Sequence, residues 1–132
     1  MIYEEISKHV INAFYAVYNK LGNGFLEKVY ENAFVIELRK RGFKVEQQKK
    51  IDVYYDGEKV GEYYADICVN DIIILELKAA ENIAPEHEAQ LIHYLKATNI
   101  ELGLLFNFGP KPKFIRRVFS NENKNINREW RE

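Results

Sequence analysis

The segment of residues 72–108 most constrains the fold, because it contains two apolar strands joined by one helix. The first strand, IIILELK at residues 72–78, begins with four aliphatic residues and ends in charged ones. Pro85 opens the helical pattern of residues 84–98, and the apolar run IELGLLFNF follows at residues 100–108. Neighbouring strands connected through a helix pair in parallel by a right-handed crossover. The segment therefore predicts a sheet that contains a parallel pair of strands.

The N-terminal half adds two helices and a long hairpin. Apolar residues at three- and four-residue steps predict an amphipathic helix in the first twenty residues, and GNG at residues 22–24 ends it. A second helix begins at about Phe25 and has a basic last turn, which suits the helix dipole. The pattern then alternates over residues 45–69, which Asp56-Gly57 divides into the two strands of a hairpin.

The last strand, FIRRVFS at residues 114–120, completes the element order ααβββαββ. We expect a mixed α/β fold in which about five strands form one mixed sheet flanked by helices. With 132 residues, 47% of them hydrophobic, the chain has enough apolar material for one core, so residues 1–120 are expected to form a single domain. The polar segment 121–132 is expected to be a frayed tail, in which Trp130 is unexplained.

Composition limits the compartment and the partners. The chain has no run of about 18 or more apolar residues, and its N-terminus lacks the order of a secretion signal, so we expect a soluble, cytoplasmic protein that does not enter a membrane. The single cysteine, Cys68, cannot form an internal disulfide and is too few for a zinc site, so it is expected to be a small core residue. The net charge of −1 neither indicates nor excludes a nucleic-acid partner, because local clustering of charge decides such binding.

Two carboxylates and one amine are predicted to meet at the end of the strand 72–78. Glu76 and Lys78 share a face because side chains at i and i+2 of a strand do, although an isolated pair of this kind is more often a solvated strand end. Asp66 lies in the preceding strand, and two carboxylates brought together repel unless a proton or a cation lies between them. A two-residue loop would set Asp66 opposite Leu75, on the wrong face. We therefore predict a loop of odd length or a bulge, which puts Asp66 on the face of Glu76.

Other polar residues could contribute to the same site. Glu27 begins the second helix, where a carboxylate is also stabilised by the helix dipole alone. Gln90 and Tyr94 lie four apart on the third helix and share a face. An alternative is that Tyr94 is a half-buried core aromatic and Gln90 its solvated neighbour. His87 and His93 are six apart on different helix faces, so a histidine-based metal site is disfavoured.

These residues together resemble a known family. The chain is similar to the GxxExxY proteins, a compact branch of the PD-(D/E)XK nuclease superfamily related to RecB-type and lambda-exonuclease-type nucleases. The resemblance covers most of the chain and rests on Gly24-x-x-Glu27-x-x-Tyr30, Asp66, Glu76-x-Lys78 and Gln90-x-x-x-Tyr94, in that order. It implies a restriction-endonuclease-like core with the active site where the central strands meet the first helices. One departure is Ala65, which precedes Asp66 where the superfamily's name has proline.

The resemblance also implies roles for these residues. Mg²⁺ or Mn²⁺ would be held by hard oxygen ligands, namely Glu27, Asp66, Glu76 and the backbone carbonyl of Leu77. Lys78 would hold or deprotonate the attacking water, and Gln90 and Tyr94 would orient the substrate or the nucleophile. The implied function is a metal-dependent nuclease that hydrolyses phosphodiester bonds, with DNA as the favoured substrate and RNA as the less favoured one. The alternative is a catalytically silent module that keeps the nuclease fold and binds nucleic acid or protein.

Two basic clusters are candidates for contacts with a nucleic-acid backbone, although each is also typical of a solvated helix end or loop. They comprise Arg39, Lys40, Arg41 and Lys44 in the first cluster, and Lys111, Lys113, Arg116 and Arg117 in the second. A homodimer built through the hairpin or the last strand is compatible with either function.

Overall fold

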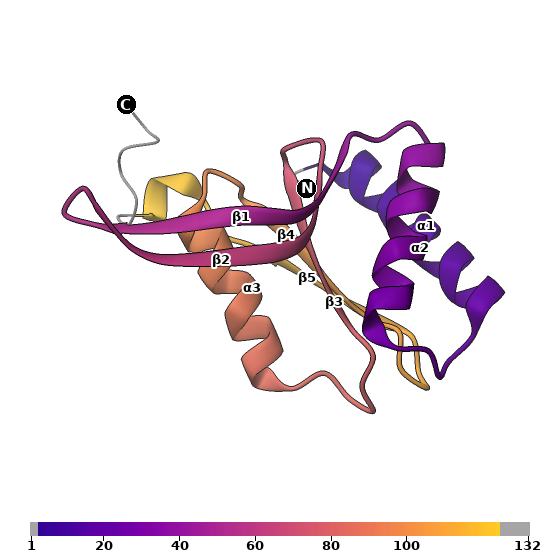
Figure 1. Cartoon of the computed structure of the whole chain (residues 1–132). Helices are drawn as coiled ribbons and strands as arrows, with labels where there is room; N and C mark the ends of the chain where they lie inside the picture. The colour runs from indigo at the N-terminus through magenta and orange to yellow at the C-terminus, as the bar shows by residue number, and fades with distance from the viewer. Residues whose placement is uncertain (1–2, 125–132) are drawn as a thin grey trace.

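A five-stranded sheet in the order β1-β2-β3-β4-β5 organises the molecule (Figure 1). The computed structural model describes residues 3–124 of the 132-residue chain. Strands β3 and β4 are parallel, whereas the other three pairs are antiparallel. The predicted element order and the mixed sheet are therefore confirmed. The elements are α1 (Glu4–Leu21), α2 (Glu27–Lys40), β1 (Val45–Tyr55), β2 (Glu58–Val69), β3 (Ile73–Lys78), α3 (Pro85–Ala97), β4 (Leu102–Asn107), β5 (Lys113–Val118) and the short 3-10 helix η1 (Asn121–Asn123).

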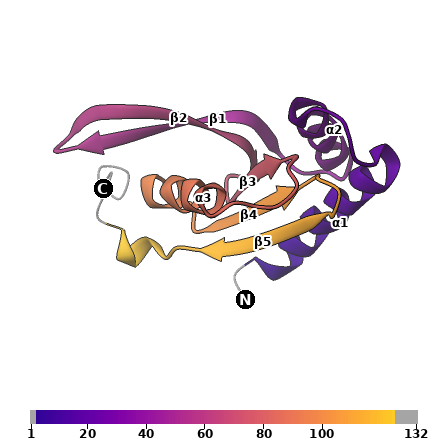
Figure 2. The ribbon, with the colours of Figure 1, turned by 90° about the horizontal axis from the view of Figure 1, so that it is seen from below.

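Helices cover both faces of the sheet. Helices α1 and α2 pack on one face in a cluster that we call the α1–α2 core, and α3 packs on the other face in the α3 core (Figure 2). The alternation of β4 shows this division, because Leu104 faces the α1–α2 core and Leu105 faces the α3 core. Helix α3 approaches the sheet so closely that a Cβ at Gly103 would lie 2.6 Å from Cδ1 of Leu91. Strands β3 and β4 are thus covered on both sides, as parallel strands usually are.

The turn between β2 and β3 has the predicted odd length. Val69 pairs with Ile73, which leaves a loop of three residues, 70–72. Asn70 and Asp71 have positive φ angles of 52° and 58°, which Asn and Asp tolerate better than other residues with a side chain. Continued by one step, this register sets Asp66 beside Glu76, so the expectation of an odd loop is confirmed.

The pairing of β1 with β2 is interrupted next to this position. Gln47 pairs with Ile67 and Lys49 with Ala65, but Gln48 is not in the ladder and has a φ of 56°. Ala65 packs in the α3 core whereas Ile67 packs in the α1–α2 core, although residues two apart on a regular strand share a face. Asp66 therefore lies where the long hairpin bends.

Beyond the bend, the paired strands β1 and β2 extend over α3 as an arm (Figure 2). The arm, residues 51–63, has Ile51 in the α3 core and exposes Tyr55 and Tyr63. Cys68, nearer the sheet, is buried in the α3 core, and burial raises the pKa of its thiol to about 11.

The beginning of the C-terminal segment is packed against the domain. Lys124 is buried and donates hydrogen bonds to the backbone carbonyls of Thr98 at 2.9 Å and Ile100 at 2.8 Å, just after α3 ends. The expectation of fraying therefore does not hold for residues 121–124, because this lysine satisfies carbonyls at the helix end. Residues 125–132, with Trp130, lie outside the described residues. No helix within residues 3–124 is long and apolar enough to cross a membrane.

Candidate active site

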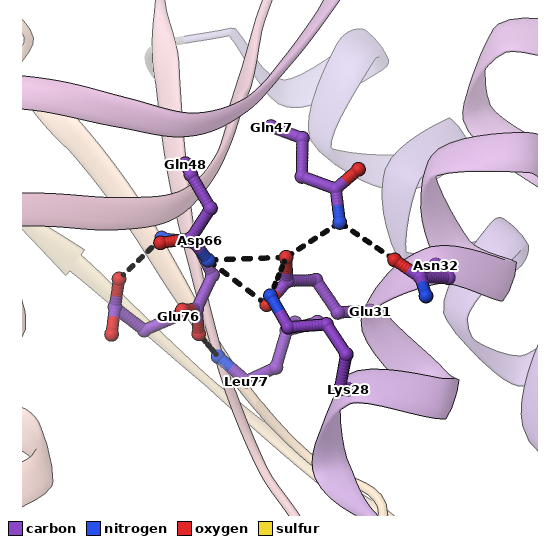
Figure 3. Close-up of polar contacts among 8 residues, drawn as sticks. All are labelled: Lys28, Glu31, Asn32, Gln47, Gln48, Asp66, Glu76 and Leu77. Carbon is purple, nitrogen blue, oxygen red and sulfur yellow. Dashed lines mark hydrogen bonds and ion pairs between the residues drawn. The ribbon is translucent and has the colours of Figure 1, made fainter.

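Asp66 and Glu76 form a carboxylate pair that the backbone holds in place. The amide of Asp66 donates a hydrogen bond to Oε1 of Glu76 at 2.9 Å, and the amide of Leu77 donates to Oδ2 of Asp66 at 2.8 Å (Figure 3). Glu76 is only 3% exposed. The second oxygen of each carboxylate makes no hydrogen bond to any residue within 3–124. Each side chain is thus fixed by one oxygen and presents the other.

The surroundings of this pair oppose its ionisation. Burial, followed by the charge of Asp66, raises the pKa of Glu76 to about 8. Burial also raises the pKa of Asp66. The hydrogen bond from the Leu77 amide opposes this rise, and the charges of Glu31 and Glu27 add to it. Two buried carboxylates side by side require a shared proton or a cation. Hard oxygen donors with unused lone pairs therefore fit a divalent ion such as Mg²⁺.

Glu27 lies at the edge of this pair and not within it. It is exposed in the first turn of α2, and its charge contributes to raising the pKa of both Asp66 and Glu76. Within the described part of the chain, no three His, Cys, Asp or Glu side chains are grouped closely enough to hold a metal ion. The structure thus brings Asp66 and Glu76 together and leaves Glu27 nearby but not in contact.

The motif around Glu27 has a structural role of its own. The hydroxyl of Tyr30 donates to the carbonyl of Gly22 and accepts from the Phe25 amide at 3.2 Å, and its ring stacks on Phe108 with centroids 4.6 Å apart. Gly24 has a φ of 118°, which only glycine adopts readily. The glycine and the tyrosine therefore fix the loop that sets where α2, and with it Glu27, begins.

Lys78 and the Leu77 carbonyl lie at the same end of β3. Lys78 follows Glu76 on the face of the α3 core, is partly exposed, and its charge opposes the rise in the pKa of both carboxyls. Within residues 3–124 it has no ion-pair partner within 4.0 Å. The N–H and C=O of one strand residue point to the same side, so the Leu77 carbonyl faces the edge on which its amide meets Asp66.

Gln90 and Tyr94 share a helix face, as the spacing predicted. Nε2 of Gln90 donates to the hydroxyl of Tyr94 at 2.8 Å. Tyr94 is 4% exposed and belongs to the α3 core, so the alternative interpretation as a core aromatic also holds. Burial raises the pKa of Tyr94 to about 12, and the charges of Glu76 and Asp66 add to this, which places the hydroxyl within electrostatic reach of the acid pair.

Glu31 is a buried carboxylate that the sequence analysis missed. It is 3% exposed and accepts hydrogen bonds from Lys28 at 2.8 Å, from Gln47 at 2.6 Å and from Gln48 at 3.1 Å (Figure 3). Burial alone would raise the pKa of Glu31, but these donors outweigh it and the pKa is lowered. The sequence pattern indicated its position, because Glu31 lies one turn after Glu27 and three residues before Phe34. Residues at this spacing share the face of the helix that packs on the core.

The first basic cluster lies at the far end of α2 from Glu27. Arg41 and Lys40 form ion pairs with Glu37, and Lys44 pairs with Asp71. A helix of 14 residues spans about 20 Å, so these charges are well separated from the first turn. Arg39 donates to the Val45 carbonyl.

The second basic cluster is divided between two places. Lys111 and Lys113 line a cavity of about 340 Å³ together with Asn107, which pairs with Lys78 across β3 and β4. Lys113 pairs with Asn107, so it lies two strands away from Lys78. Its backbone is therefore about 10 Å from that of Lys78. Arg116 and Arg117 lie further along β5, where Arg117 pairs with Glu88. That either cluster contacts nucleic acid stays a prediction.

Two solved structures are similar to this fold. The solved structure of SSO0001 has 21% sequence identity and a TM-score of 0.57, and the match covers 89% of this chain and 61% of that one. An alkaline exonuclease (LHK-Exo) from Laribacter hongkongensis has 11% identity and a TM-score of 0.53, covering 92% of this chain and 73% of that one. At such identities the likeness shows the fold alone, which is restriction-endonuclease-like. No curated protein matches the chain significantly.

A family model provides the assignment that these distant structures cannot. The model described as the PD-(D/E)XK nuclease superfamily matches residues 4–118, which include all elements from α1 to β5. The chain therefore belongs to the PD-(D/E)XK nuclease superfamily.

Proposed function

We propose that this protein is a metal-dependent nuclease that hydrolyses phosphodiester bonds in DNA, and that it belongs to the GxxExxY branch of its superfamily. The observation that carries the proposal is the carboxylate pair of Asp66 and Glu76, which the three-residue loop sets side by side with one unbonded oxygen each. Lys78 on the same face completes an acid-acid-lysine set. Such a set suits phosphodiester hydrolysis, in which negative charge develops at the phosphate.

Asp66, Glu76, the Leu77 carbonyl and Glu27 would hold Mg²⁺ or Mn²⁺. When bound, the ion supplies positive charge for the scissile phosphate and favours deprotonation of water. The pair would then ionise fully, since the charge of the cation offsets the burial and the repulsion that raise both pKa values. Glu27, on the exposed first turn of α2, would join the pair through a change of side-chain rotamer.

Lys78, Gln90 and Tyr94 would act on the nucleophile and the substrate. The Nζ atom of Lys78, without an ion-pair partner within residues 3–124, would hold the attacking water or accept its proton. With its pKa raised to about 12, Tyr94 keeps its hydroxyl proton at neutral pH. The Tyr94 oxygen accepts from Gln90, and its hydroxyl donates to the Tyr64 carbonyl at 3.5 Å, a long hydrogen bond that a substrate oxygen would replace.

A cleavage assay tests the proposal. Single-stranded, double-stranded and branched DNA, with RNA of the same sequence, would be incubated with Mn²⁺ or Mg²⁺ and the purified protein. The wild type should cut at least one DNA, EDTA should abolish cutting, and Lys78→Ala should slow it by about 100-fold or more. Lys8→Ala, an exposed lysine of α1, is the matched control and should cut like the wild type.

A thermal-shift measurement made in parallel distinguishes a metal-binding nuclease from a binding module without activity. Mn²⁺ should raise the melting temperature of the wild type and not that of Asp66→Ala. A folded wild type that binds DNA, cuts nothing and shows no shift with Mn²⁺ would contradict the nuclease and support a silent binding module.

A further inference from the structure

We propose that the cavity between the arm and α3 binds an unpaired nucleobase beside the scissile phosphate, so that the substrate class is single-stranded or frayed nucleic acid. This inference rests on the proposed function and adds to it the form of the substrate. It starts from a cavity of about 590 Å³, a size typical of small-ligand sites. Its lining comes from both walls and includes Ile51, Val53 and Tyr63 of the arm and Gln90, His93 and Tyr94 of α3.

The cavity and the candidate active site share a wall. Tyr94 lines the cavity, and its hydroxyl, which accepts from Gln90 and donates to the Tyr64 carbonyl at 3.5 Å, lies within electrostatic reach of Glu76 and Asp66. Gln90 also lines the cavity. A nucleotide whose phosphate lies at the acid pair carries its base on the adjoining sugar, and in this proposal that base enters the cavity beside Tyr94 and Gln90.

The chemistry of the lining fits a base. Tyr63 is 51% exposed and its ring lies 6.1 Å from that of Tyr94, so the cavity has an aromatic wall open to a stacking partner. Ile51, opposite Tyr63 in the ladder, contributes an apolar surface. Gln90 and His93 supply hydrogen-bonding groups for the edge of a base. Stacking on aromatic side chains is how proteins commonly bind single strands, because every base has a π face.

A base within a duplex would not fit this cavity. Its two faces are covered by neighbouring base pairs, and its Watson–Crick edge is occupied by its partner. A base in a single strand, at a frayed end or extruded from a duplex has a free face and a free Watson–Crick edge. The placement of the arm over α3, with the cavity between them, therefore favours unpaired nucleotides at the cutting site.

Binding to oligonucleotides tests this inference. The dissociation constants of a fluorescent single strand and of the matching duplex would be measured by anisotropy in Ca²⁺, with a gel to show that both stay intact. Tyr63→Ala should weaken single-strand binding by about 5- to 100-fold and leave duplex binding unchanged. Ala89→Trp fills the cavity from an exposed position on α3 and should have the same effect, so a folding defect of one variant is not decisive.

An abasic scan locates the base. Single strands that each lack one base should show one position at which wild-type affinity falls, and Tyr63→Ala should abolish that position's effect. Tyr55→Ala, an exposed tyrosine of the arm outside the cavity lining, is the control and should bind like the wild type. Equal binding of single strands by the wild type, Tyr63→Ala and Ala89→Trp would overturn the inference, even if the protein cuts DNA. Binding that depends on Tyr63 without any cleavage would instead contradict the proposed nuclease and leave the base site standing.

Discussion

Two buried carboxylates near each other, Glu31 and Glu76, have opposite pKa shifts. Glu31 receives donors from Lys28, Gln47 and Gln48, and its pKa is lowered. Glu76 is as little exposed, but the side chain next to it is another carboxylate, and its pKa is raised to about 8. Burial is thus common to both, and the neighbours decide the sign. The donors around Glu31 outweigh its burial, whereas the Asp66 amide and the charge of Lys78 offset only part of the cost of ionising Glu76.

The raised pKa of Glu76 predicts a stability that falls as pH rises. Between the unfolded pKa of about 4.5 and the folded pKa of about 8, the folded protein keeps a proton that the unfolded chain has released. Rising pH then favours unfolding. The free energy of unfolding from urea titrations in EDTA should fall by at least about 1.4 kcal/mol between pH 5 and pH 8, the equivalent of one pKa unit.

The matched variant is Glu76→Gln, which keeps the size of the side chain and cannot ionise. Its stability should fall distinctly less over the same interval, and Mg²⁺ should reduce the fall in the wild type and not in the variant. If the stability of the two proteins changed equally with pH in EDTA, the raised pKa could not belong to Glu76.

At the scale of the elements, the bend at Gln48 determines where the site is placed. Gln48 has a φ of 56° in a strand, a conformation that is costly for a residue with a side chain, and its amide contacts Glu31 on α2. The bend leaves Asp66 outside the ladder of β1, so its backbone amide is available to Glu76. Helix α2, strand β1 and the acid pair are thereby coupled.

Gln48→Val should therefore be costly, whereas Lys50→Val on the regular part of the same strand should not. A β-branched residue is strained at this φ and also removes the donor to Glu31, so we expect a loss of about 1–3 kcal/mol in the free energy of unfolding. Lys50 is exposed, and its substitution should change stability by about 0.5 kcal/mol or less. Urea denaturation at pH 7 measures both. Equal effects would mean that the bend stores no strain.

The sequence allowed the register of β2 and β3 to be predicted, because two carboxylates on one face require an odd loop. It also allowed the element order to be predicted, since the change from helical to alternating periodicity is local. The bend could not be predicted in this way. The letters QQKK are all polar and carry no glycine or proline that would mark a bend, and the hydrogen bonds of Gln48 go to a residue 17 positions away. Glu31 was missed because a charge on a helix is usually solvated.

At the scale of the whole molecule, the basic residues are distributed unevenly about the site. Lys111 and Lys113 lie near the end of β3 that holds Lys78, and neither forms an ion pair within 4.0 Å inside residues 3–124. Lys40 and Arg41 lie at the far end of α2 and pair with Glu37. A phosphate backbone that reaches Asp66 and Glu76 would thus pass the first pair of charges and not the second.

The salt dependence of DNA binding should distinguish these two pairs. Each phosphate contact releases a counterion, so replacing Lys111 and Lys113 by alanine should weaken binding and reduce the slope of log K against log salt by about 1.4 to 1.8. Replacing Lys40 and Arg41 by alanine removes the same charge at the far end of α2, where Glu37 offsets part of it, and should leave the slope unchanged because the nucleic acid does not pass there. Anisotropy titrations between about 50 and 200 mM salt measure both slopes. If the second substitution flattened the slope as much as the first, the nucleic acid would have to extend along the whole of α2, and the site at the end of β3 would be only one part of a longer interface.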